Sequence, residues 1–143
     1  MTGDRPGWDN YFLGIARAVA ARADCSRAQH GAVIVRENRI ISAGYNGAPA
    51  GRPGCLSGAC PRANSTVPSL SGYDNCVSIH AEANAMLYAA RTEMVNATLY
   101  VTGQPCQWCL KTGAAAGLTR MIWNENASVL SVHTYTRNEN YAR

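Results

Sequence analysis

Two short segments, far apart in the chain, carry side chains that bind metal ions, and they constrain the fold more than any other feature of the sequence. His80-Ala-Glu82 is the first, and Pro105-Cys-Gln-Trp-Cys109 is the second. Zinc prefers thiolate and imidazole ligands in a tetrahedral arrangement. Because such ligands must surround one point, the chain has to fold so that the two segments meet.

The spacing within the second segment suits shared binding of one ion. Cys106 and Cys109 are three residues apart at the start of a helical pattern, so both sulfurs can face the same ion. Free amides at a helix N-terminus and the metal charge favour the thiolate form. His80 supplies a third ligand, and catalytic zinc sites keep a fourth position open for water. We therefore predict a catalytic zinc held by His80, Cys106 and Cys109.

Glu82 has a different predicted role, because it lies two positions after His80. Residues i and i+2 diverge by about 200° on a regular helix, so Glu82 faces the substrate beside the metal. The combination H-x-E…P-C-x-x-C is typical of zinc-dependent hydrolytic deaminases. In that chemistry zinc makes hydroxide available near neutral pH, and Glu82 moves protons to the ring nitrogen and to the departing ammonia. We also expect the backbone amide of Ala81 to bind a pyrimidine carbonyl oxygen.

Each segment alone has a simpler interpretation. His-Ala-Glu also suits a solvated helix start, and Pro-Cys-x-x-Cys also suits half of a zinc ribbon or a redox pair. A further alternative is a non-catalytic binding module in which the zinc only stabilises the fold. Glu82 is not needed as a ligand in such a module, so its presence argues against this alternative. The two segments together, each at a helix start, favour the enzyme.

The length and composition indicate one globular domain over residues 1–143. The chain is 47% hydrophobic and 15% charged. It contains no apolar run of the roughly 20 residues that span a membrane and no signal-peptide pattern, so we expect a cytoplasmic protein. Hydrophobic periodicity predicts helices over 8–23, 79–91 and 106–116, strands over 32–36, 39–45, 98–102 and 120–123, and a Gly- and Pro-rich loop over 46–75.

This order of elements predicts an α/β fold. The short turn at Glu37-Asn38 joins the first two strands into an N-terminal hairpin, and the alternating second half indicates parallel crossovers on a mixed sheet. The expected architecture is a three-layer α/β/α sandwich. The apolar stretch 129–132 fits either a last strand or partial disorder.

The charge distribution favours a small-molecule substrate. The net charge is +4, and the arginines are scattered without a polybasic run. A tRNA adenosine deaminase, which shares the zinc motif, needs a broad basic surface to hold RNA. We therefore expect neither a nucleic-acid nor a membrane partner.

Several further segments resemble one known family, the deoxycytidylate (dCMP) deaminases of the cytidine deaminase superfamily. The resemblance covers about residues 6–124, and Gly44-Tyr-Asn-Gly47 is its most specific part. It implies conversion of dCMP to dUMP in pyrimidine deoxynucleotide metabolism, a homo-oligomer that is often a hexamer, and regulation by dCTP and dTTP. Deamination of another cytosine nucleoside or nucleotide stays open as an alternative. The other matching segments are Arg5–Phe12, Gly31–Val35, Ala48–Gly51, His80–Ala85, Leu99–Thr102, the Pro-Cys-x-x-Cys segment and Ala116–Leu118.

The resemblance also suggests residues that contact the nucleotide. Asn46 matches a family residue near the nucleotide, although Asn-Gly is equally typical of a turn. The candidates for binding the 5′-phosphate are Arg27, Arg52 and Arg62. Each of them could also be a solvated surface side chain, and we retain Arg27 as a site residue. His30 stands where the family usually has Val, and it either contacts substrate or is simply packed or exposed.

Four further cysteines surround the long loop. Cys25 and Cys55 match positions that hold a second, structural zinc in some family members. With Cys60 and Cys76 they are expected to form a Cys₄ site that would order the loop. The alternative is that Cys25 is a small buried apolar residue and the others are loop thiols.

Overall fold

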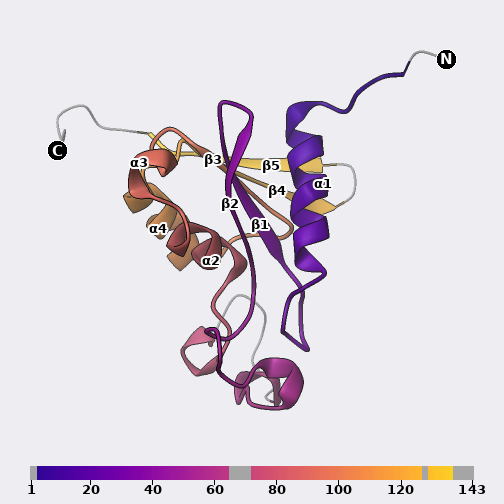
Figure 1. Ribbon diagram of the computed structural model, residues 1–143, viewed down its shortest axis with the longest axis vertical. Coiled ribbons are helices and arrows are strands. Elements are labelled where there is room, and N and C mark those ends of the chain that lie inside the picture. Colours follow the sequence, from indigo (N-terminus) through magenta and orange to yellow (C-terminus); the bar gives the residue numbers. More distant parts are fainter. Residues whose placement is uncertain (1–2, 65–71, 127–128, 137–143) are drawn as a thin grey trace.

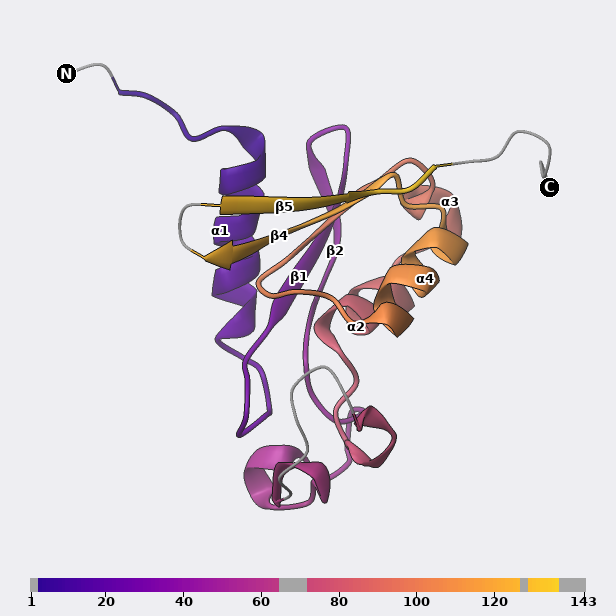
Figure 2. The same ribbon diagram turned by 180° about the vertical axis from the view of Figure 1, so that it is seen from behind.

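A computed structural model of the protein describes residues 3–64, 72–126 and 129–136. A five-stranded sheet forms the centre, with helices on both of its faces (Figures 1 and 2). The helices are α1 (Trp8–Ala20), α2 (Ala81–Leu87), α3 (Arg91–Met94) and α4 (Gln107–Ala116), and the strands are β1 (Gly31–Arg36), β2 (Arg39–Tyr45), β3 (Thr98–Val101), β4 (Arg120–Asn126) and β5 (Val129–Thr134).

The sheet is mixed, with the strand order β2-β1-β3-β4-β5. The strand β1 pairs antiparallel with both β2 and β3, β3 and β4 are parallel, and β4 and β5 are antiparallel. Because α4 connects the two parallel strands, its N-terminus follows the carboxyl end of β3. Functional sites in open α/β sheets lie at that edge.

The central strands are buried on both faces, so the protein has two cores. On one face α1 places Phe12 and Leu13 against Val33 of β1. On the other face Ile34 of β1 and Leu99 of β3 pack below the other helices. Successive side chains of a strand point to opposite faces, which explains why the apolar run in β1 supplies both cores. The predicted α/β/α sandwich is confirmed.

The predicted N-terminal hairpin is also confirmed. Glu37 and Asn38 have φ values of 53° and 59°, the left-handed pair that a two-residue type I′ turn requires. Asn tolerates this conformation well, and the matching twist of the flanking strands compensates for Glu.

Two predicted helices are longer than the observed ones. The first ends at Ala20 rather than at residue 23, because the backbone N–H of Asp24 bonds to the Asn46 carbonyl 2.8 Å away. The helix predicted over 79–91 corresponds to α2, which ends at Leu87, and a separate helix, α3, begins at Arg91. Ile79 pairs with Gly47 in a β-bridge, and Ala90 is extended with ψ 138°. Tertiary contacts override the helix propensity of this Ala-rich run.

The segment 129–132, for which strand and disorder were both open, lies in β5. Residues 137–143 are outside the described part of the chain. No helix among the described residues is both long and apolar enough to cross a bilayer.

Helix α2 lies directly on β2, and a glycine permits this close approach. A Cβ atom on Gly44 would lie 2.4 Å from the Ala85 nitrogen and 2.6 Å from the Ala81 oxygen. Both are backbone atoms, so α2 would have to move away from the sheet, and His80 precedes α2 directly.

We expect Gly44→Ala to lower the free energy of unfolding by about 1–3 kcal/mol, as overpacking against backbone does. Gly14→Ala is the matched control, since its Cβ would meet only Arg17 Nη2 at 3.9 Å. Inside α1 that change should raise stability by roughly 0.5–1 kcal/mol. Urea denaturation of both variants is the measurement, and equal stability of the two would contradict this account of the α2–β2 contact.

Candidate active site

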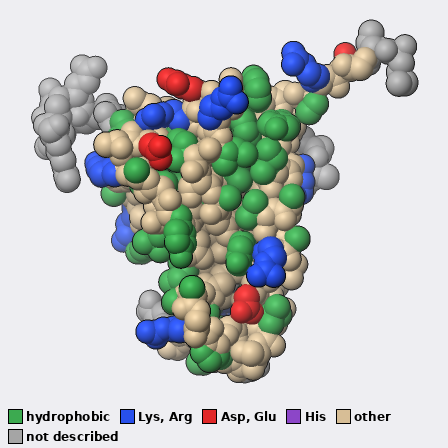
Figure 3. Space-filling view, viewed as in Figure 1, with side chains coloured by type: hydrophobic (Ala, Val, Ile, Leu, Met, Phe, Trp, Pro, Cys, Tyr) green, Lys and Arg blue, Asp and Glu red, His purple; other side chains and the backbone are tan. Residues whose placement is uncertain are grey.

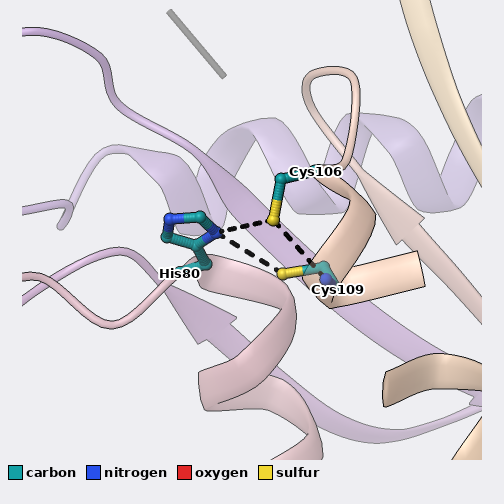
Figure 4. A group of neighbouring side chains, drawn as sticks. All are labelled: His80, Cys106 and Cys109. Atoms are coloured by element: carbon teal, nitrogen blue, oxygen red, sulfur yellow. Dashed lines mark hydrogen bonds between the residues drawn. The ribbon is translucent and has the colours of Figure 1, made fainter. Parts of the chain in front are cut away.

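Three side chains from the two motif segments converge on one point. His80 Nδ1 lies 3.4 Å from Cys106 Sγ and 3.5 Å from Cys109 Sγ (Figure 4). A tetrahedral zinc with bonds of about 2.0–2.3 Å separates its ligand atoms by about 3.3–3.8 Å. The observed spacing therefore fits a zinc ion at the centre of the three atoms.

The starts of two helices position these ligands. His80 is the N-cap residue of α2 and has an extended backbone. Cys106 is the N-cap residue of α4, and its sulfur accepts a hydrogen bond from the Cys109 N–H at 3.5 Å. An N-cap side chain points back toward free helix amides, which favour negative charge there.

The surroundings of the ligands also favour a cation between them. Burial is the main cause that raises the pKa of Cys109, and the neighbouring Glu82 and Cys106 raise it further. Such a thiol ionises readily only beside a positive charge. Burial lowers the pKa of His80, with a further contribution from His30 and Arg62, so the imidazole is neutral and able to ligate.

Glu82 lies beside the cluster. Its Oε2 is 3.7 Å from Cys109 Sγ, and the residue is 6% exposed. Burial raises the pKa of Glu82 to about 7. A carboxyl group with this pKa can both accept and donate a proton near neutral pH, as a general acid–base catalyst must.

A cavity of about 280 Å³ opens onto this cluster. Its size is close to the lower end of the range for small-molecule sites, about 300–1,000 Å³. The structure brings most of the predicted site residues to its wall. These are Arg27, Asn46, His80, Ala81, Glu82 and Cys106.

Asn46 is buried and holds the wall in place. Its Oδ1 accepts from the His30 N–H at 2.8 Å, and its Nδ2 donates to the Ala28 carbonyl at 2.9 Å. Both ends of the amide therefore fix the backbone before β1, a role that the turn interpretation did not include. Contact between Asn46 and a nucleotide stays a prediction.

The long loop supplies a second wall, which contains the phosphate candidate Arg62 and also Tyr73, a residue that the sequence did not indicate. Tyr73 packs edge-to-face on His80 with ring centroids 4.3 Å apart. The Arg62 guanidinium lies 4.6 Å from the centroid of the Tyr73 ring, and the Arg27 Nη1 is 3.5 Å from the Arg62 carbonyl oxygen. Tyr73 and Arg62 lie in short 3₁₀ turns, which carry no hydrophobic periodicity, so this arrangement could not be predicted from a pattern of apolar residues.

A residue after the last strand supports the ligand-bearing helix. The Tyr135 hydroxyl donates to the Leu110 carbonyl of α4 at 2.7 Å. A Cβ on Gly113 would lie 2.5 Å from that hydroxyl oxygen, so the glycine makes room for it. Sequence reasoning assigned no role to either residue.

A second zinc site and separate loop thiols were both open for the other four cysteines, and among the described residues no three of their sulfurs lie within 4.8 Å of one another. Cys60 and Cys76 have their sulfurs 3.8 Å apart, and Cys25 lines the cavity together with Cys76. Cys55 Sγ is instead hydrogen-bonded by the Ser26 N–H at 3.3 Å. Within the described ranges, His80, Cys106 and Cys109 form the one group of three or more metal-binding side chains with donor atoms within 4.8 Å of one another.

Comparison with known families agrees with the geometry of the site. Residues 6–125 match the family model described as the cytidine and deoxycytidylate deaminase zinc-binding region. The chain belongs to this family.

Named relatives lie within the same family. A deoxycytidylate deaminase of Mycobacterium phage D29 is 51% identical over 124 residues, which is 83% of this chain and 95% of the relative. The deoxycytidylate deaminase of Schizosaccharomyces pombe is 39% identical over 91% of this chain, but the match spans only 40% of that longer protein.

A solved structure shares the fold. The dCMP deaminase from the cyanophage S-TIM5 superposes with a TM-score of 0.61 at 24% identity and covers 84% of each chain. The same protein has also been solved in complex with dCMP and dUMP. At this identity the likeness supports the architecture of the sheet and helices.

Metal analysis of variants tests the ligand assignment. Protein purified under reducing conditions without chelator should contain about one zinc per chain, and Cys109→Ser should lose most of it because a catalytic site has only three protein ligands. Cys55→Ser is the matched control and should keep the metal. Equal zinc content in the two variants would contradict the assignment.

Proposed function

We propose that this chain catalyses the zinc-dependent hydrolytic deamination of dCMP to dUMP and ammonia. The observation that carries the proposal is the position of Glu82, whose carboxyl oxygen lies 3.7 Å from a ligand sulfur at a cavity of about 280 Å³. A purely structural zinc site has no need of a buried carboxyl group beside its ligands. Membership of the deaminase family and the relative in Mycobacterium phage D29 support the choice of dCMP.

His80, Cys106 and Cys109 would hold the metal. When bound, zinc supplies a Lewis acid that activates water for attack on the amino-bearing ring carbon. Glu82 accepts the proton that the water loses and delivers a proton to the ring nitrogen. It then takes the remaining proton of the attacking oxygen, which becomes the new ring carbonyl, and passes it to the amino group, which leaves as ammonia.

Other residues of the cavity orient the nucleotide. The backbone N–H of Ala81 is at the first position of α2, where helix amides have no intrahelical partner, and it would bind the ring carbonyl oxygen. Arg27, at the cavity wall and near Arg62, is proposed to bind the 5′-phosphate as a charged donor. Asn46 would position the sugar or the base.

The wider setting follows from the same family membership. We propose that the domain comprises residues 1–143 and that it is a cytoplasmic homo-oligomer without nucleic-acid or membrane partners. We further propose that it acts in pyrimidine deoxynucleotide metabolism under control by dCTP and dTTP. On the face shown in Figure 3 the Lys and Arg side chains lie apart from one another, which suits a small-molecule substrate.

Light scattering with and without dCTP and dTTP tests the oligomeric state. We expect the mass of a hexamer.

Ammonia release from purified protein tests the activity, with dCMP, CMP, deoxycytidine and dCTP compared side by side. Turnover should be highest with dCMP. Glu82→Gln should retain zinc and lose turnover by a factor on the order of 10²–10⁴, because the general acid–base group is gone. Unchanged turnover in this variant, or no turnover of dCMP by zinc-loaded wild-type protein with dCTP present, would refute the proposal.

A further inference from the structure

His30 lies in the wall of the active-site cavity and has no part in the chemistry derived so far. Its side chain is half-buried and lines the cavity together with Glu82 and Ala81. The backbone N–H of His30 is fixed by Asn46 Oδ1 at 2.8 Å. The imidazole therefore starts from a rigid backbone position.

The Thr102 hydroxyl bonds to one nitrogen of the His30 ring. Its oxygen accepts from the Gly31 N–H at 3.1 Å and lies 3.2 Å from His30 Nδ1. In the tautomer that leaves a donor for the cavity, the hydroxyl donates its own hydrogen to Nδ1. Burial lowers the pKa of His30, so the ring is neutral near pH 7, and in this tautomer its one proton is on Nε2.

Gly103 fixes the orientation of the ring. A Cβ atom at this position would lie 2.6 Å from His30 Cε1 and 2.9 Å from Nδ1. The imidazole therefore packs on the bare backbone that follows β3, with Thr102 at Nδ1. Its Nε2–H is a donor that needs little reorganisation to bind a ligand.

We propose that His30 binds substrate by donating a hydrogen bond from Nε2–H to an oxygen of the sugar-phosphate part of the nucleotide. The reactive edge of the base must face Glu82 and the metal ligands, whereas His30 belongs to the same short segment as Arg27, the phosphate candidate. Oxygen acceptors at that end of a deoxynucleotide are the phosphate oxygens and the 3′-hydroxyl. This inference rests on the proposed deamination of dCMP.

The test compares His30→Val, which removes the donor, with His30→Gln, which keeps an N–H at similar reach. Steady-state kinetics with dCMP and calorimetric binding of dUMP are measured for both. We expect His30→Val to raise KM and to weaken dUMP binding by about tenfold, the size of one hydrogen bond in a buried site, with kcat changed less than about twofold. His30→Gln should recover part of the loss.

Two substrate analogues identify the acceptor. If the acceptor is a phosphate oxygen, His30→Val should have no effect on the KM for deoxycytidine. If it is the 3′-hydroxyl, the effect should vanish with 2′,3′-dideoxycytidine 5′-monophosphate.

Gly103→Ala is a second variant for the case that His30→Val fails to fold. It displaces the His30 ring but keeps the imidazole, and it should weaken dUMP binding as His30→Val does.

Gln29→Val is the matched control, because Gln29 is exposed and adjacent to His30. Zinc content and melting temperature establish that each variant is folded. Wild-type KM and dUMP affinity in folded His30→Val would overturn the role of His30, whereas a wild-type protein without dCMP turnover would refute the proposed function itself.

Discussion

The meeting of His80 Nδ1 with the sulfurs of Cys106 and Cys109 is the constraint on which the rest of the structure depends. Separations of 3.4 and 3.5 Å require that α2 and α4 begin at the same edge of the sheet. The close contact of α2 with β2 at Gly44 and the parallel pairing of β3 with β4 meet that requirement. The fold therefore brings two separate segments to the geometry of one tetrahedral ion.

The same arrangement buries two ionisable side chains, whose charged forms are disfavoured away from water. Glu82 is almost fully buried, and Cys109 is completely buried beside it. Burial and the neighbouring Glu82 raise the pKa of Cys109, and a positive ion between the ligands relieves this conflict. A carboxyl group whose pKa burial raises to about 7 is unfavourable for stability and useful for proton transfer. The burial of a carboxyl group beside the metal ligands is thus best explained by catalysis.

Much of this architecture could be predicted from the sequence, because the signals were local or chemical. Short apolar runs on either side of the Glu37-Asn38 turn located β1 and β2, and the spacing of the Cys and His residues located the metal site. The break between α2 and α3 could not be predicted, since an Ala-rich run favours a continuous helix, whereas the backbone at Ala90 is extended. The edge-to-face contact of Tyr73 with His80 and the hydrogen bond from the Ser26 N–H to Cys55 Sγ depend on irregular backbone, which has no periodic pattern.

X-ray absorption at the zinc edge of the purified protein tests the central claim most directly. A zinc at the site described here has two sulfur ligands at about 2.3 Å and two nitrogen or oxygen ligands at about 2.0–2.2 Å, one of them exchangeable with solvent. That spectrum would establish that the three convergent side chains form an open catalytic site. A first shell of four sulfurs would contradict the account, because the metal would then be held by the loop cysteines and not beside Glu82.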